Sequence, residues 1–256
     1  MKIKLPTTML TRHQLLLTAL GFSASFVPLC GCEVKINNDP ALAKSPSLKI
    51  KNVAVEYKED LDLMVFSMDL EGPAGKAIPK AVGRLDGAPV LAYVFPTTLK
   101  AADVGMGDAE GIVALAITSH PDFDDTPLWD EDANGKYDDD KVIYHTHWAL
   151  LAKDDRVPGG LAVKEFKKEE KSVVLPPTNC GMPMYLDAAG HSVVERGNTL
   201  RAIVPAYYLH NKTKFGFDGV TCYMQVNTSC MAKPMLGVYE VYSVASKDLS
   251  LPYQTK

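Results

Sequence analysis

Short apolar segments, separated by turns rich in Gly, Pro, Asn and Asp, fill the chain from about residue 48 to its end. Residues 53–57 alternate between apolar and polar side chains, residues 63–70 are their expected partner strand, and residues 90–95 are apolar on both sides. Such segments are typical of β-strands, and no window shows the sustained 3.6-residue period of an α-helix. Further strand candidates are residues 111–118, 142–152, 161–166, 172–175, 192–195, 199–209, 220–226 and 236–244. The chain is therefore predicted to be all-β, with about ten antiparallel strands.

The fold expected for residues 48–256 is a single antiparallel β-sandwich, either immunoglobulin-like or jelly-roll-like. All-β domains of 200 or more residues often remain undivided, so a length of 256 residues does not require two domains. A content of 46% hydrophobic and 23% charged residues is ordinary for a globular protein and sufficient for a substantial core. Strand spacing does not separate a sandwich from a barrel-like pair of sheets.

The first 31 residues have the features of a signal peptide. Three basic residues precede an apolar run at residues 15–22, which is too short for a membrane span, and the segment ends in Leu-Cys-Gly-Cys at residues 29–32. This ending resembles the lipobox of bacterial lipoproteins, and the resemblance implies cleavage before Cys32 and a lipid on its thiol. The alternative is a cleaved secretory signal followed by an unmodified thiol.

Residues 11–16, TRHQLL, look like a twin-arginine export motif in which His13 replaces the second arginine. Because the arginine pair is what that pathway reads, general secretion is favoured. Residues 32–47 are polar with two prolines, and they predict a flexible tether with a reach of roughly 50 Å. Together these features predict attachment to a membrane through an N-terminal lipid, in the cell envelope, facing the periplasm or the exterior.

The charge and the cysteines limit the partners and the compartment. The net charge is −4, and removal of the three basic residues of the first 31 leaves −7, which disfavours nucleic acid as a partner. Three cysteines, Cys180, Cys222 and Cys230, follow Cys32, and in an oxidising compartment two of them should pair. Cys222 and Cys230 flank a plausible reversal at residues 227–229, so they are the predicted disulfide, with Cys180 left over.

An acidic loop at residues 130–138, DEDANGKYD, resembles the calcium loops of EF-hand and dockerin proteins. The resemblance implies that side-chain oxygens of alternate residues, one backbone carbonyl and a final carboxylate surround one calcium ion. The corresponding residues are Asp130, Asp132, Asn134, Lys136 and Asp138. Lys141 stands where an EF-hand has its bidentate glutamate, so the neighbouring carboxylates would have to complete the site. The alternative is a solvated turn with Asn-Gly at its tip.

His145 and His147 are predicted to lie on one face of a strand, with Trp148 on the opposite, core-facing side. Two imidazoles on one face can bind zinc, copper or iron, and His120 joins them if the strands on either side of the acidic loop pair. The alternative is a pair of partly exposed histidines hydrogen-bonded on a sheet. His-x-His-Trp also occurs in the alpha-type carbonic anhydrases, but the third histidine that they carry about two dozen residues downstream is missing here, which excludes that family.

Two functions follow from these features. The favoured one is a non-catalytic, lipid-anchored lipoprotein with a calcium loop, acting as a binding or envelope-associated module. The other is a metal-dependent enzyme or metal carrier that uses His120, His145 and His147 with zinc or copper. A carbohydrate groove lined by aromatic residues such as Tyr207 and Tyr208 is a third, weaker alternative, because aromatic residues on strands usually belong to the core.

Overall fold

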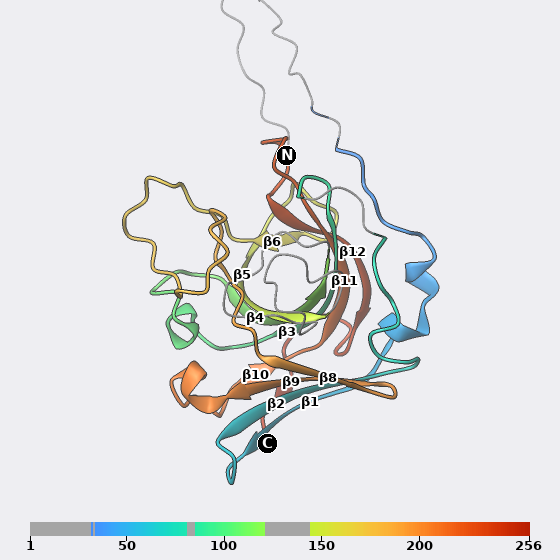
Figure 1. Ribbon diagram of the computed structural model, residues 1–256, viewed down its shortest axis with the longest axis vertical. Helices are drawn as coiled ribbons and strands as arrows, with labels where there is room; N and C mark the ends of the chain where they lie inside the picture. Colours follow the sequence, from blue (N-terminus) through green and yellow to red (C-terminus); the bar gives the residue numbers. More distant parts are fainter. Residues whose placement is uncertain (1–31, 33, 81–84, 121–143) are drawn as a thin grey trace, which may run out of the picture. The chain divides into compact units, whose positions relative to one another are not determined.

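Antiparallel strands form most of the fold in a computed structural model of this protein, which confirms the all-β prediction (Figure 1). The structure describes residue 32 and residues 34–80, 85–120 and 144–256, and residues 32–256 form one compact unit. The strands are β1 (Ile50–Lys58), β2 (Leu63–Leu70), β3 (Pro89–Pro96), β4 (Ile112–Ser119), β5 (His145–Lys153), β6 (Leu161–Val163), β7 (Leu186–Asp187), β8 (Ser192–Arg196), β9 (Thr199–Pro205), β10 (Gly216–Phe217), β11 (Val220–Val226), β12 (Leu236–Val244) and β13 (Tyr253–Gln254). Short 3₁₀ turns occur at η1 (Leu42–Lys44), η2 (Pro46–Leu48), η3 (Ala101–Val104) and η4 (Ala206–Leu209). None of these helical segments is long and apolar enough to cross a membrane, and this holds for the described residues only.

The larger sheet closes into a barrel. Its strand order is β4-β3-β11-β12-β6-β5-β7, and β4 also pairs with β5, so that six strands form a ring (Figure 1). Irregular register between β11 and β12, at Thr221/Cys222 and Tyr223/Met224, accompanies the curvature of the wall. The sandwich prediction therefore gives way to a barrel, because pairing of β4 with β5 joins the two edges that a sandwich would leave open.

A second sheet, with strand order β1-β2-β9-β8, packs against one side of the barrel. The aromatic ring of Phe66 on β2 lies 5.5 Å from that of Phe95 on β3, in an edge-to-face arrangement. Gly219 permits a close approach of the two layers, since a Cβ there would lie 2.4 Å from Cγ1 of Val53. On this side of the molecule the four-stranded sheet therefore covers the wall of the barrel.

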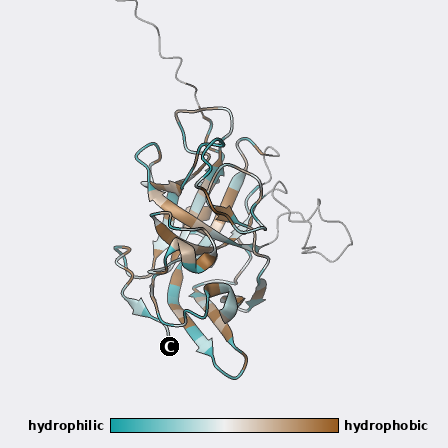
Figure 2. Ribbon diagram, turned by 90° about the vertical axis from the view of Figure 1, so that its left-hand side faces the viewer, coloured by the Kyte–Doolittle hydropathy of each residue, from teal (hydrophilic) through white to brown (hydrophobic). Residues whose placement is uncertain are grey.

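Alternation along the barrel strands creates two separate cores. On β3, Leu91, Tyr93 and Phe95 face the second sheet, whereas Val90, Ala92 and Val94 face the barrel lumen. All eight residues of β3 are buried for this reason, as the apolar run in the sequence predicts. Figure 2 shows the resulting hydrophobic stretches on the strands. The lumen is therefore enclosed by apolar side chains with little contact to solvent.

Two strand predictions are wrong. Residue 172 lies in a turn and residues 173–175 form irregular chain, because the bonding to β5 ends at Lys164 and Glu165 makes only an isolated bridge with Met184. The segment 199–209 divides at Pro205, where β9 ends and the 3₁₀ turn η4 begins. Pro205 cannot donate to a strand ladder, which explains the division.

The segment predicted as a free tether is docked on the barrel. The side chain of Gln225 on β11 donates to the carbonyl of Lys35 at 2.8 Å and accepts from the backbone N–H of Asn37 at 2.8 Å. Tyr242 on β12 donates to Asn38 at 2.8 Å. Gln225 is fully buried, and these bonds satisfy an amide that would otherwise be costly to bury.

The disulfide joins Cys32 to Cys230, with Cα atoms 5.8 Å apart, and not Cys222 to Cys230. Cys222 faces the lumen from β11, forms no disulfide, and burial raises the pKa of its thiol to about 12. Alternation on the strand thus points Cys222 away from Cys230, which lies beyond the strand end. Because the Cys32 sulfur cannot form both a disulfide and a lipid thioether, the two describe mutually exclusive states of that residue.

Candidate metal centre

The pairing of β4 with β5 sets the positions of three histidines. Thr118 pairs with His145 and Ala116 with His147, so the lumen-facing residues of both strands lie side by side. His120 follows the last residue of β4 and continues the lumen-facing alternation. The strand register brings His120 next to His145, so the three predicted histidines lie side by side on one face of the wall.

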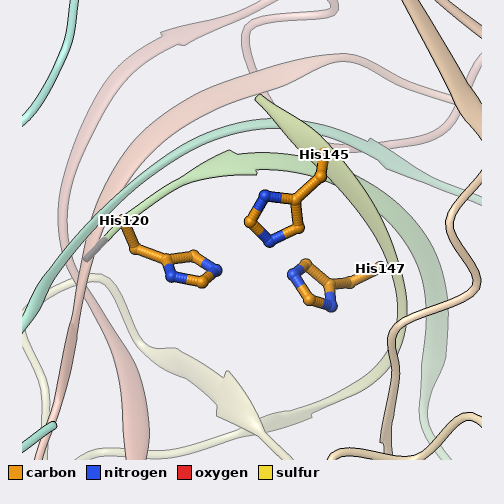
Figure 3. A group of neighbouring side chains, drawn as sticks. All are labelled: His120, His145 and His147. Carbon is orange, nitrogen blue, oxygen red and sulfur yellow. The ribbon is translucent and has the colours of Figure 1, made fainter. Parts of the chain in front are cut away.

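The three imidazole rings converge on one point in the lumen (Figure 3). Ring centroids lie 4.6 Å apart for His120 and His145, 4.7 Å for His145 and His147, and 5.8 Å for His120 and His147. One ligand nitrogen from each ring lies within 4.8 Å of the others. His120 and His147 are buried and His145 is half-buried, so the group is largely shielded from water.

This arrangement fits a transition-metal ion. Zinc–nitrogen bonds of about 2.0–2.1 Å in tetrahedral geometry separate the ligand nitrogens by about 3.3 Å. Nitrogens within 4.8 Å of one another reach that separation by small rotations of the side chains. The histidines therefore can bind one metal ion, and three protein ligands leave a tetrahedral ion one open position.

The environment keeps His147 neutral, the protonation state that a metal requires. Burial, reinforced by neighbouring His120, lowers the pKa of His147 to about 3, although a hydrogen bond with the backbone of Asp187 opposes this shift. Backbone hydrogen bonds to the second ring nitrogen are also the usual way in which a metal-binding histidine is oriented. At neutral pH His147 is thus ready to act as a ligand.

The side chain of Asp187 fixes the position of the backbone that contacts His147. Its carboxylate is fully buried and accepts hydrogen bonds from Thr178 Oγ1 at 2.5 Å and from the hydroxyl of Tyr208. Burial raises the pKa of the Asp187 carboxyl, and the two hydroxyl donors oppose this shift. The strand β7 that carries Asp187 is only two residues long, so these side-chain bonds hold it against β5.

No family model matches this chain, and no curated protein and no solved structure is significantly similar to it either. The geometry of the three histidines and the chemistry of their surroundings therefore carry the functional conclusion.

The other predicted site residues are not part of this centre. The calcium-loop residues Asp130, Asp132, Asn134, Lys136 and Asp138 lie outside the described residues, so calcium binding stays a prediction. Tyr208 is held by Asp187 and by the ring of His191, 4.6 Å away, which leaves it unavailable to stack on a sugar.

Sequence reasoning missed the surroundings of the histidines. Asp187, Thr178 and His191 come from segments that showed neither a motif nor a regular spacing relative to residues 145–147. His191, expected in a hairpin turn without a role, accepts a hydrogen bond from Trp148 Nε1 at 3.0 Å. Only the alanines at positions 114, 116 and 149, which leave space on the histidine face, were a usable signal.

His191 should make the metal-free protein sensitive to acid. Burial lowers its pKa to about 4, and its Nε2 must be unprotonated to accept from Trp148. The unfolded chain binds this proton at about pH 6.5. The contribution of His191 to the free energy of unfolding is therefore fully present above that pH, and about 2–3 kcal/mol of it is lost as the pH falls toward 4. Denaturant unfolding between pH 7 and 4 measures this loss.

The variant His191→Gln keeps an acceptor for Trp148 but does not titrate, so its stability should depend less on pH over the same range. His210→Gln, at an exposed histidine, serves as the control. Parallel pH profiles for His191→Gln and the unmodified protein would contradict the assignment.

Proposed function

We propose that this protein binds one transition-metal ion, zinc or copper, through His120, His145 and His147, and uses it in an extracytoplasmic compartment. The observation that carries the proposal is the convergence of three ring nitrogens within 4.8 Å at the end of an apolar lumen. Three histidine ligands are the set that catalytic zinc sites commonly use, whereas structural zinc sites usually contain cysteine. The protein is thus better described as a metal-dependent enzyme than as a passive binding module.

The bound ion would supply Lewis-acid chemistry at its open position. The chain contributes the orientation of the rings, through the backbone contact of Asp187 with His147, and the exclusion of bulk water by the lumen wall. With the rings oriented and bulk water excluded, a small molecule that enters the lumen would react at the ion without competition from solvent.

Titration of metal-free protein with zinc tests the proposal, using protein without a histidine tag. The expected result is uptake of one ion per chain at neutral pH, with nitrogen donors visible by X-ray absorption. Zinc binding should weaken in acid, because protons compete for the ring nitrogens, although burial delays this competition at His147, whose pKa is lowered to about 3. Absence of uptake at neutral pH would overturn the proposal.

Placement in the cell envelope rests on the signal-like N-terminus and on a disulfide, which persists in oxidising compartments. The two forms of Cys32 predict different fates for the chain: a soluble exported protein with the disulfide, or an anchored one with the lipid. The intact mass of the mature protein separates them. A lipid mass on Cys32 favours the anchored lipoprotein, and its absence favours the soluble form.

A further inference from the structure

The barrel lumen is a cavity that begins at the histidines. Its volume is about 110 Å³, several times the space that one water needs. Pairing of Ala116 with Val94, and of Val94 with Val220, extends its lining from the histidine end across β3 to β11. Val244, the partner of Val220 on β12, continues the lining around the barrel. The cavity is large enough for a molecule of about the size of a benzene ring.

The lining is apolar except at one end. Of the described residues that line the cavity, only Thr118, His120 and His147 have polar side chains that can hydrogen-bond strongly, and none is an acid, a lysine or an arginine. These three residues lie together, because β4 ends and β5 begins at the same end of the barrel. In the metal-free protein a charged ligand would find no counter-charge among these lining residues, so the metal-free lumen favours a neutral molecule.

The buried hydroxyl of Thr118 is independent evidence for a ligand in the cavity. Its Oγ1 is buried and makes no hydrogen bond within the described part of the chain, although the residue is only 4% exposed. A buried hydroxyl without a partner destabilises a protein, so such a group usually has a partner such as a ligand or an ordered water. Because Thr118 pairs with His145 and lines the same cavity, a polar atom bonded to its hydroxyl would also lie near the histidines.

We infer that the lumen binds a small alcohol or phenol, with its hydroxyl between Thr118 and the histidines and its apolar body in the barrel. This inference rests on the proposed metal site for the second contact of the ligand hydroxyl, whereas the contact with Thr118 does not require the ion. The apolar body fills the space between Ala114, Val220 and Val244. The lumen thus selects for a molecule with one hydroxyl at one end and none along its body.

Calorimetric titration of the zinc-loaded and metal-free protein with phenol and with benzene tests the inference. Phenol should bind more tightly than benzene to both forms, and zinc should strengthen only phenol binding. Thr118→Val removes the hydroxyl while keeping the shape, so phenol should bind about tenfold more weakly and benzene without loss. Equal phenol affinity in Thr118→Val and the unmodified protein would overturn the inference.

A lumen-filling variant locates the ligand. Val244→Phe adds bulk inside the barrel on β12, which pairs with neither of the histidine strands β4 and β5, and should remove binding of both molecules while zinc uptake stays at one per chain. Val174→Phe makes the same change at an exposed position and should have no effect. Phenol binding that survives Val244→Phe would place the molecule outside the lumen and contradict the inference.

The two proposals fail in different ways. If zinc is not taken up but phenol still binds in a manner sensitive to Thr118→Val, the metal function is wrong and the lumen site stands. If zinc binds at one per chain but neither molecule enters, the lumen inference is wrong and the metal site stands.

Discussion

Replacing His147 by alanine is expected to abolish stoichiometric zinc binding at neutral pH. The ring of His147 lies between the lumen and the backbone of Asp187, and its loss leaves two histidines, too few for a stable tetrahedral site. Loss of an outer hydrogen-bond partner of a metal ligand typically weakens metal affinity about 10–100-fold, so loss of the ligand itself should weaken it more. Zinc titration followed by competition with a chelator measures the change.

His210→Ala is the matched control, because His210 is exposed and belongs to the turn after η4. Its zinc uptake should equal that of the unmodified protein. The melting temperature of metal-free His147→Ala shows whether the variant is folded. A folded His147→Ala protein that still binds one zinc ion with unchanged affinity would show that the three histidines are not the zinc site.

Replacing Phe66 by alanine should lower the free energy of unfolding by about 3–5 kcal/mol, a large share of the stability of an ordinary domain. Phe66 is fully buried between the second sheet and the barrel. Its ring contacts Phe95, Trp148 and Phe215 with centroid distances of 5.5, 6.0 and 6.1 Å. Removal would leave a cavity where the two layers meet.

Urea unfolding of the metal-free protein at neutral pH gives this value. Leu61→Ala, at a residue that is 62% exposed in the turn between β1 and β2, is the control and should change the free energy of unfolding by less than about 0.5 kcal/mol. A loss below about 1 kcal/mol for Phe66→Ala would mean that the contact between sheet and barrel is not a rigid core.

The all-β class could be predicted from the sequence because each of the longer strands shows its own local pattern. The eight buried residues of β3 and the alternation around His145 and His147 are visible without any knowledge of the fold. Closure of the barrel could not be predicted, because it depends on which edges meet, and β4 and β5 pair across a connection whose geometry the sequence does not specify.

The candidate site was predictable in part for the same reason. His145 and His147 share a face by strand periodicity alone, whereas His120 joins them only through the register between β4 and β5. Asp187 reaches His147 from a strand of two residues, which is too short to leave a periodic signal. The disulfide was mispredicted because nearness in sequence favoured Cys222, while the docked N-terminal segment brings Cys32 to Cys230 across 198 residues.

The pairing of strands distant in sequence also constrains when the protein can fold. In the second sheet β2 pairs with β9, and in the barrel β3 pairs with β11, so each layer combines early residues with residues after 199. Neither layer can complete its hydrogen bonds until nearly the whole chain is available, and such long-range pairing is slow to form. During synthesis, the fold, the lumen and the disulfide would therefore form only after β9 and β11 have become available, late in the chain.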